Sequence, residues 1–481
     1  MEKSRLLKLL SGPLAAAIVW AFFELDPANP LTTRMAGIIA WITIWWLTEA
    51  LELGVTALLP LVLMPLLGIA DMKTTSMQYM DQVIFLFIGG FMLAIAMEKW
   101  NLHKRIALNI LLRVGSKPSQ ILFGVMLSSF LMSMWISNTA TVMMLFPAVV
   151  SIAAGIKTGD TGYEKFAAGM MIGLAYSATI GGMCTLVGTP TNMIFASFYS
   201  REFPSTEISF ANWLLFAMPL AALFFVFTFF VLKFLFIRNF KLTGFSKIDL
   251  VQQLKSLGAI NREEKIVLAV FFSAAVLWFF RSRIDVGFME IKGWSEFFGK
   301  PAYLQDSTVA ICMALLLFLI PSKEKNAAIL EWKDAKRIPF NIVFLFGGGF
   351  AIAMGFEASG LSNWLAEVLS SFRGADMLVV IMVVCCVITL LSEFASNVAT
   401  IQLMLPVLVS MSVSLDIPAL TLMIPATLAA SSGFMLPVAT APNTIVYSSG
   451  LIPQRYMLKA GVILDICFII LIVCAFMVFS F

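Results

Sequence analysis

Long apolar runs separated by short polar segments make up most of the chain. The runs fall near residues 10–25, 35–53, 54–71, 83–98, 118–156, 166–200, 211–237, 264–280, 306–321, 338–356, 376–416, 418–450 and 458–480. A transmembrane helix needs about 20 mostly apolar residues, so 118–156 and 376–416 are too long for one helix. If each of these two runs is a hairpin, the other runs predict an all-α polytopic membrane protein with about 11 transmembrane helices.

The composition supports this class and excludes others. Of the 481 residues, 60% are apolar and 12% are charged, about half of the roughly 25% that is typical of soluble domains. This excludes a soluble globular protein, a disordered chain and a nucleic-acid binder. No paired-His zinc motif, phosphate-binding Gly-Lys loop or Ser elbow occurs, so we do not expect an enzyme. The basic N-terminus continues into the apolar stretch 9–23 without an obvious cleavage site, which predicts a first span and not a signal peptide.

The basic residues predict the orientation. With the N-terminus in the cytoplasm, 24 of the 32 Lys and Arg residues fall in cytoplasmic segments, including Lys157 and the loop that begins at residue 239. Membrane proteins carry such an excess of positive charge in their cytoplasmic loops. We therefore predict a cytoplasmic N-terminus and an inner or plasma membrane of the bacterial type.

Three blocks of the first half recur in the second half. They are 85–91 and 344–350, and 137–141 and 396–400, both at an offset of 259, and 189–192 and 440–443 at an offset of 251. The connector 99–117 carries five basic residues, whereas its counterpart 358–375 carries only Arg373. The two copies therefore have opposite orientations. Inverted repeats with interrupted helices are typical of secondary transporters, whose site lies between the repeats near the midplane.

The recurring Ser-Asn pair lies at the centre of each long run. Ser137 is the midpoint of 118–156, and Ser396 is the midpoint of 377–415. One interpretation is two full spans joined by a surface turn at the motif. The other is a re-entrant hairpin, whose tip lies inside the protein or against a wet cavity. We favour the re-entrant form because the residues leading into both motifs are apolar and the motif recurs in an inverted partner.

The tip residues have a chemistry suited to ions. Ser and Asn cap helix N-termini, and the N–H groups and dipole of a half-helix that starts there attract an anion such as a carboxylate. The carbonyl groups that end the preceding half-helix, with Ser and Asn side-chain oxygens, can hold a hard monovalent cation. A single Ser-Asn-Thr sequence would be explained by a plain cap, but two matched copies favour a binding site.

The Thr-Pro-Thr-Asn block at 189–192 and the Thr-Ala-Pro-Asn block at 440–443 interrupt two further apolar runs. One copy would be explained as a proline kink, which frees a helix carbonyl; a matched pair favours a site. By contrast, we expect the Gly89-Gly90 and Gly348-Gly349 pairs to serve close helix packing.

No Lys or Arg occurs in 118–156, 166–200 or 374–454, which carry all of these motifs. An anion there must be met by helix ends, amides, hydroxyls and co-bound cations such as Na⁺. The carboxylates within the apolar runs are Glu49, Glu52, Glu393 and Asp465. Each is a candidate proton relay, although we favour interface or hydrogen-bonded structural roles.

These features resemble the divalent anion/sodium symporter family, which transports dicarboxylates, citrate and sulfate. The resemblance covers nearly the whole chain and implies two sodium sites. The first would comprise Ser133, Ser137, Asn138 and Gly188, and the second Ser392, Ser396, Asn397 and Ala439. The implied substrate-binding residues are Asn138, Thr139, Thr189, Pro190, Ser396, Asn397, Thr440 and Ala441. Val398 departs from the family pattern because it stands where a full second motif has Thr.

The resemblance also implies a homodimer in the lipid bilayer that works by an elevator motion. The expected parts are scaffold helices and a first connector (1–117); a hairpin, broken helix and following span (118–238); a cytoplasmic loop, scaffold helices and second connector (239–375); and a second hairpin, broken helix and last span (376–481). The two hairpin-bearing parts would form the moving transport domain.

The leading hypothesis is therefore a secondary transporter of di- or tricarboxylates, such as succinate, malate or fumarate, coupled to Na⁺. A dicarboxylate exchanger without net Na⁺ coupling and a transporter of sulfate or another divalent anion stay open as alternatives. A membrane-embedded enzyme and a passive channel are remote alternatives. The chain lacks the nucleophile–base or metal set that such an enzyme needs. The paired broken helices suggest an occluded site, which argues against a passive channel.

Overall fold

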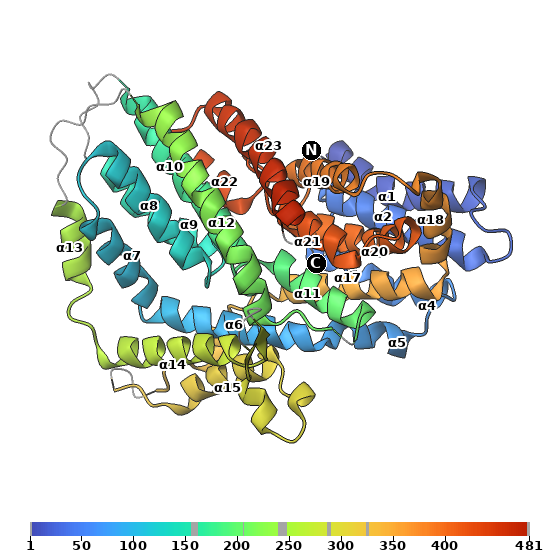
Figure 1. Cartoon of the computed structure of the whole chain (residues 1–481), viewed down its shortest axis with the longest axis horizontal. Helices are drawn as coiled ribbons and strands as arrows, with labels where there is room; N and C mark the ends of the chain where they lie inside the picture. The colour runs from blue at the N-terminus through green and yellow to red at the C-terminus, as the bar shows by residue number, and fades with distance from the viewer. Residues whose placement is uncertain are drawn as a thin grey trace.

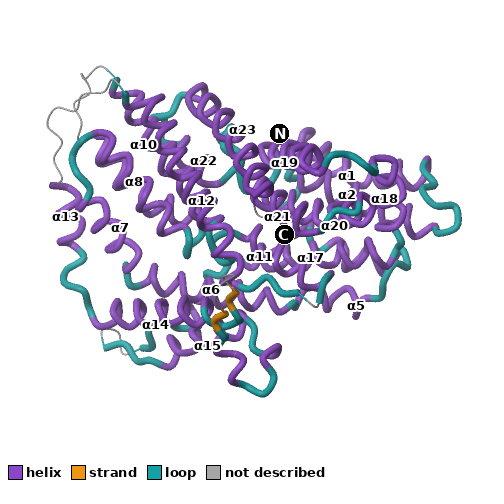
Figure 2. Tube along the Cα trace, in the orientation of Figure 1, coloured by secondary structure: helices purple, strands orange, loops and turns teal. Residues whose placement is uncertain are grey.

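The computed structural model describes residues 2–154, 162–204, 206–238, 248–285, 290–323 and 327–478, and this part of the chain is mostly helical (Figure 1). Lys157 and the stretch 239–247 of the expected cytoplasmic loop lie outside it. Figure 2 shows one small exception, an antiparallel pair of strands β1 (Ile284–Asp285) and β2 (Glu290–Ile291). The all-helical prediction missed this pair because two-residue strands leave no alternation of apolar and polar residues.

The first two helices of the N-terminal part pack closely against each other. Its elements are α1 (Glu2–Phe22), α2 (Pro30–Thr48), α3 (Leu53–Thr56), α4 (Leu59–Leu66), α5 (Met72–Met77), η1 (Gln78–Met80), α6 (Gln82–Lys99) and α7 (Leu102–Arg113). Helix α2 begins after Asn29, whose Oδ1 accepts the Leu31 N–H at 3.2 Å, and α6 begins after Asp81, whose Oδ1 accepts the Val83 N–H at 3.0 Å. Such side chains satisfy N–H groups that have no partner within the helix.

The middle of the chain packs around α6 and α17. Its elements are α13 (Ile248–Ser256), α14 (Arg262–Phe279), η3 (Trp294–Phe297), η4 (Pro301–Tyr303), α15 (Asp306–Leu319), α16 (Trp332–Ala335), α17 (Phe340–Ala358), α18 (Leu361–Leu369) and η5 (Ser370–Phe372). A Cβ on Gly89 of α6 would lie 2.6 Å from Ala310 Cβ, and one on Gly348 of α17 would lie 2.6 Å from Ala57 O. These two glycines thus permit close packing of α6 on α15 and of α17 on the α3–α4 junction.

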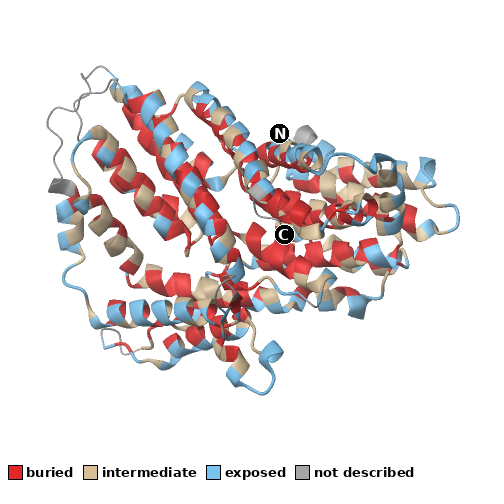
Figure 3. Cartoon of the chain, viewed as in Figure 1, coloured by how far each residue is buried: buried red, intermediate tan, exposed pale blue. Residues whose placement is uncertain are grey.

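The first hairpin and the helices that follow it in the chain pack together around α10 (Tyr163–Met183). They are α8 (Pro118–Ser133), α9 (Asn138–Ala154), α10 (Tyr163–Met183), α11 (Pro190–Glu202), α12 (Phe210–Leu232) and the π-helical turn η2 (Lys233–Ile237). Helix α10 contacts α8, α9 and α12, and every residue from Phe166 to Met183 is buried (Figure 3). A helix buried on all sides forms the centre of a bundle.

The C-terminal elements complete this group. They are α19 (Met377–Phe394), α20 (Asn397–Leu415), α21 (Ala419–Ala430), α22 (Ala441–Tyr447) and α23 (Gln454–Val478). The packing crosses between the halves of the chain, because α11 contacts α20 and α21, whereas α22 contacts α9 and α10. Helix α23 also contacts α12, α19 and α21. Each short helix that follows a break therefore packs on the hairpin of the other half.

The helices are apolar enough for a membrane protein. Within the described residues, eight helical segments are long and apolar enough to cross a bilayer, and further apolar helices of 10–17 residues include Pro118–Ser133 and Ala419–Ala430. The predicted class of an all-α membrane protein is confirmed at this level. The count of about 11 crossings and the re-entrant form of the hairpins stay predictions.

Candidate functional site

The tip of the first hairpin brings a serine and an asparagine together across a helix break. Helix α8 ends at Ser133 and α9 begins at Asn138. The buried Ser133 hydroxyl donates to Asn138 Oδ1 at 2.6 Å, and Ser137 Oγ accepts the Ala140 N–H at 3.2 Å. Ser137 thus caps α9, as the sequence predicted for a motif serine.

The tip of the second hairpin repeats the first contact and lacks the second. The Ser392 hydroxyl lies 2.6 Å from Asn397 Oδ1, matching the distance between Ser133 and Asn138. It also lies 2.5 Å from the carbonyl oxygen of Ala430 at the end of α21. Ser396 is the N-cap residue of α20, but its side chain makes no capping hydrogen bond. The capping prediction therefore holds for Ser137 and is wrong for Ser396, whose hydroxyl is not used by its own helix.

At each of the two helix breaks, an asparagine side chain binds backbone carbonyl groups, and the two asparagines occupy matching positions in the repeats. Asn192 Nδ2 donates to the carbonyls of Gly182 at 3.2 Å and Thr185 at 2.8 Å. At the offset of 251, Asn443 Nδ2 donates to Gly433 O and Leu436 O, each at 3.0 Å. The sequence analysis did not assign these amides a role, although their recurrence at one offset was the signal that could have found them.

Glycines bring the predicted residues of each sodium set into contact. A Cβ on Gly182 would lie 2.4 Å from Asn138 Oδ1, and one on Gly188 would lie 2.5 Å from Gly182 O. In the second half, a Cβ on Gly433 would lie 3.0 Å from Ala439 Cβ and 3.5 Å from Ser392 O. The first helix break therefore lies against the first hairpin tip, and the second break lies against the second tip.

The predicted substrate-binding residues occupy both helix starts and a small cavity. Thr440 Oγ1 accepts the Asn443 N–H at 3.2 Å and so caps α22, whereas Thr189 Oγ1 lies 3.3 Å from Thr191 Oγ1. Pro190 occupies the first turn of α11 and therefore starts a helix instead of kinking one. It lines a cavity of about 20 Å³ with Ser137 and Gly188 among other residues, which is room for about one water molecule.

The remaining predicted residues lie at the edge of this region. Thr139 is half-buried in the first turn of α9, and Ala441 is exposed at the start of α22. The halves meet next to the breaks, where the Thr191 and Ser431 hydroxyl oxygens lie 2.8 Å apart.

The donor set suits a hard monovalent cation. The groups at each tip are hydroxyl, amide and backbone oxygens, and two further buried oxygens, Asn192 Oδ1 and Asn443 Oδ1, have no hydrogen-bond partner within the described residues. Soft metals prefer Cys and His ligands. The described part of the chain holds no group of three His, Cys, Asp or Glu side chains that could bind such a metal. The residues present therefore fit Na⁺.

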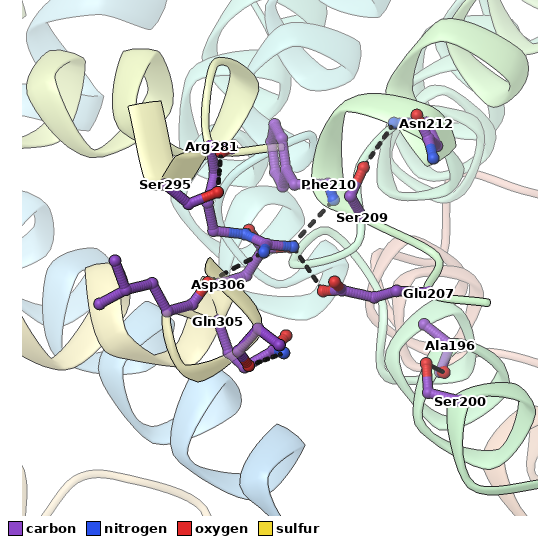
Figure 4. Close-up of polar contacts among 12 residues, drawn as sticks. Ala196, Ser200, Glu207, Ser209, Phe210, Asn212, Arg281, Ser295, Gln305 and Asp306 are labelled. Carbon is purple, nitrogen blue, oxygen red and sulfur yellow. Dashed lines mark hydrogen bonds and ion pairs between the residues drawn. The ribbon is translucent and has the colours of Figure 1, made fainter. Parts of the chain in front are cut away.

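Figure 4 shows an ionic cluster, centred on Arg281, that the sequence analysis missed. Arg281, in the segment after α14, pairs with Asp306 at 2.5 Å and with Glu207, which lies between α11 and α12. Asp306 Oδ2 accepts the Phe210 N–H at 2.9 Å. Burial raises the pKa of the Glu207 carboxyl, and the charge of Arg281 opposes this shift. The cluster joins α14, α15 and α12, and no spacing in the sequence indicates that these three segments meet.

Comparison with known proteins identifies the family. The chain matches the family described as sodium:sulfate symporter transmembrane region over residues 3–480. The protein belongs to this family. The resemblance seen in the sequence is thereby confirmed, as is the prediction of a transporter and not an enzyme. Membership of this symporter family also makes the protein an integral membrane protein.

Two sodium-dependent dicarboxylate transporters are similar to this protein along nearly the full chain. The sodium-dependent dicarboxylate transporter SdcS of Staphylococcus saprophyticus is 38% identical over 478 residues, which cover 98% of this chain and 90% of SdcS. The protein of the same name from Staphylococcus aureus strain USA300 is 37% identical over 466 residues, which cover 95% of this chain and 88% of that one.

Two solved structures share the fold at low sequence identity. Neisseria gonorrhoeae MtrF, described as illuminating a class of antimetabolite efflux pumps, has a TM-score of 0.57 at 12% identity, over 85% of this chain and 83% of MtrF. The YdaH transporter of Alcanivorax borkumensis has a TM-score of 0.57 at 14% identity, over 85% of this chain and 86% of YdaH. At such identities the likeness concerns the fold alone, and both neighbours are membrane transporters.

Proposed function

We propose that the protein is a secondary transporter of di- or tricarboxylate anions, such as succinate, malate or fumarate, driven by Na⁺. The observation that carries this proposal is the pair of matched Ser-Asn contacts at the hairpin tips, each 2.6 Å long and each next to a broken helix. The names of the two similar proteins, sodium-dependent dicarboxylate transporters, support the same substrate class and the same ion.

The proposal includes two sodium sites. The first comprises Ser133, Ser137, Asn138 and Gly188, and the second comprises Ser392, Ser396, Asn397 and Ala439. Oxygen atoms converge at each tip without an Asp or Glu among these residues. Bound Na⁺ would supply the positive charge that attracts the carboxylates of the substrate.

The substrate would lie between the two tips. Its carboxylates would meet Asn138, Thr139, Thr189, Pro190, Ser396, Asn397, Thr440 and Ala441. The first turns of α9, α11, α20 and α22 all belong to this set, and helix N-termini bind anions through free N–H groups. Because no Lys or Arg occurs in these segments, substrate binding depends on the bound Na⁺, and this dependence couples the two fluxes.

The architecture that goes with this function has two inverted repeats, about 11 transmembrane helices and two re-entrant hairpins, with the N-terminus in the cytoplasm. Residues 118–238 and 376–481 would form a transport domain that moves as an elevator against scaffold parts 1–117 and 239–375 of a homodimer. The recurrence of the asparagine contacts at one offset supports the repeats. The crosswise packing of α11 on α20 and of α22 on α9 supports one moving unit.

Two alternatives have a specific observation behind them. Val398 removes a hydroxyl from the second tip, which favours a dicarboxylate exchanger without net Na⁺ coupling. The name of the family favours sulfate as the anion.

Uptake into proteoliposomes tests the proposal. Labelled succinate should accumulate in empty vesicles under an inward Na⁺ gradient, and an equal K⁺ gradient should give no accumulation. Uptake only into vesicles preloaded with unlabelled succinate would refute symport and support exchange. Labelled sulfate, measured in parallel, decides the anion. Transport of neither anion under any gradient would refute the proposed function.

A further inference from the structure

Two buried carboxyl groups lie outside the proposed sodium and substrate sets. Glu393, in the last turn of α19, and Asp465, in the middle of α23, have exposed fractions of 0% and 3%. The Glu393 carboxylate accepts the backbone N–H groups of Met435 and Leu436, both at 2.8 Å. A side chain of the hairpin thus holds the segment that joins α21 to α22.

Asp465 has no matching set of partners. Both of its carboxyl oxygens lack a hydrogen bond to any described residue, although the group lies beside the Glu393 carboxyl and the Phe434 N–H. The nearby Tyr176 hydroxyl is already engaged with Phe434 O at 2.5 Å and Met457 O at 3.2 Å. The basic residues at the start of α23, Arg455 and Lys459, are exposed. The hydrogen bonds that hold the segment between α21 and α22 therefore belong to Glu393, which accepts two backbone N–H groups, and not to Asp465.

The corresponding junction in the first half is bridged by other atoms. Met134 corresponds to Glu393 at the offset of 259, and Thr185 corresponds to Leu436 at the offset of 251. There the Thr185 hydroxyl donates to the backbone oxygen of Met134 at 2.5 Å. Both halves thus tie the hairpin tip to the helix break at the same place. The first half uses a hydroxyl from the break, and the second uses a carboxylate from the tip.

The tie reaches the proposed second sodium site through one residue. Leu436, whose N–H is bound by Glu393, accepts the Ala439 N–H at 3.2 Å and the Asn443 amide at 3.0 Å through its own carbonyl. Ala439 belongs to the proposed sodium set, and so does Ser392, the neighbour of Glu393 in the chain. The position of both relative to each other is therefore set through the Glu393 carboxylate.

We propose that Glu393 is a positioning residue of the second sodium site, because its carboxylate fixes the Leu436 and Ala439 segment relative to Ser392. This inference rests on the proposed function, because it presupposes that Na⁺ binds at the second tip. In Glu393→Gln, the amide has one acceptor oxygen for two N–H groups, and its NH₂ group faces a donor. The Ala439 segment then loses its fixed distance from Ser392.

Thermal stabilisation of the purified full-length protein by Na⁺ tests this inference. Glu393→Gln should raise the Na⁺ concentration for half-maximal stabilisation by about tenfold, as expected for loss of a charged hydrogen bond. Glu393→Asp keeps two acceptor oxygens on a side chain that is one carbon shorter, so its loss of Na⁺ affinity should be smaller than that of Glu393→Gln. Asp376→Asn, on an exposed carboxyl at the other end of α19, is the matched control and should behave as wild type.

The outcomes separate the inference from the proposed function. Wild-type Na⁺ affinity in Glu393→Gln, with a normal response of the wild type, would overturn the inference and leave sodium binding intact. A larger loss in Glu393→Asp than in Glu393→Gln would overturn the acceptor role of the carboxylate. No stabilisation of the wild type by Na⁺ would overturn both the inference and the proposed function. If Glu393→Gln does not fold, the Na⁺ affinity of Glu393→Asp decides.

Discussion

At the scale of single residues, the site depends on space that only glycine leaves free. Gly182 faces Asn138, whose Oδ1 would lie 2.4 Å from an added Cβ and is already held by Ser133. Contacts below about 3 Å force a shift, and overpacking costs about 1–3 kcal/mol. The Asn138 amide therefore cannot keep its position when Gly182 is replaced.

We predict that Gly182→Ala weakens Na⁺ binding at the first tip by about tenfold, which corresponds to about 1.4 kcal/mol. The measurement is the Na⁺ dependence of succinate uptake. Gly299→Ala is the control, because Gly299 is exposed and its Cβ would meet nothing within 4 Å. Unchanged Na⁺ dependence in Gly182→Ala would argue against Asn138 as a sodium ligand.

The residues that the sequence could predict are those whose chemistry repeats. The family resemblance implied that Ser133 and Asn138 share one ion site and that Ser392 and Asn397 share another, and the structure brings each pair into contact. Other roles depend on which atoms face each other, and spacing does not encode this. Ser396 looks like a capping serine in the sequence, yet its hydroxyl does not cap α20. Likewise, Asp465 lies more than 70 positions from Glu393, and only the fold brings them together.

At the scale of secondary structure, the Arg281 cluster connects three helices, α12, α14 and α15. Its guanidinium is buried and pairs with the buried Asp306 at the start of α15, which in turn binds the backbone of α12 through Phe210. Removing one partner of a buried ion pair leaves an uncompensated charge, which costs about 3–5 kcal/mol.

Arg281→Met should therefore lower stability by about 3–5 kcal/mol, visible as a lower unfolding temperature of the purified protein. Arg283→Met provides the control two residues along the chain. Arg283 pairs with Glu290 and Glu296 at 3.1 Å, but its side chain is half exposed, so its loss should hardly change stability. Equal effects of the two variants would mean that burial does not decide the strength of these pairs.

The sequence predicted which segments are helical better than it predicted where each helix begins and ends. The apolar runs locate most of the long helices, and the breaks at Ser137 and Ser396 fall where the motif centres predict. The short helices α13 and α18 were not expected, because nine-residue amphipathic helices with charged residues do not stand out from loops on apolarity alone.

At the scale of the whole molecule, few polar contacts tie α11 to the proposed scaffold. The Ser197 hydroxyl donates to Asp81 at 3.0 Å, and Arg201 binds Gln78 and lies 5.3 Å from the ring of Phe350. An elevator motion of 118–238 against 1–117 has to break these contacts in every cycle. Because these two side chains touch, cysteines at 197 and 81 would lie within reach of a short reducible reagent that bridges two thiols.

We predict that cross-linking a Ser197→Cys/Asp81→Cys double variant with a short bis-methanethiosulfonate reagent stops succinate transport and that a reductant restores it. Each single variant, treated with the same reagent, controls for the six native cysteines and for the loss of the Asp81 cap. Continued transport by the verified cross-linked protein would show that α11 and α6 do not separate, and the proposed elevator would then be wrong.

The overall class was predictable because it depends on sums over many residues, namely apolar length and basic charge. The crosswise packing of α11 on α20 and of α22 on α9 was not, because it depends on contacts about 200 to 300 positions apart. The repeats indicated that two similar units exist, but not that each unit would complete the other.

The complete enclosure of α10 has a consequence for how the protein is made. All residues from Phe166 to Met183 are covered by protein, and some of the cover comes from α22, which begins at Ala441. Ribosomes add roughly 5–20 residues per second, so α10 waits for roughly 15–50 s after synthesis before α22 exists. During that interval its Gly- and Ala-rich surface faces lipid or the insertion machinery. The nascent chain is therefore most exposed to mispairing and degradation while its central helix is still incompletely covered.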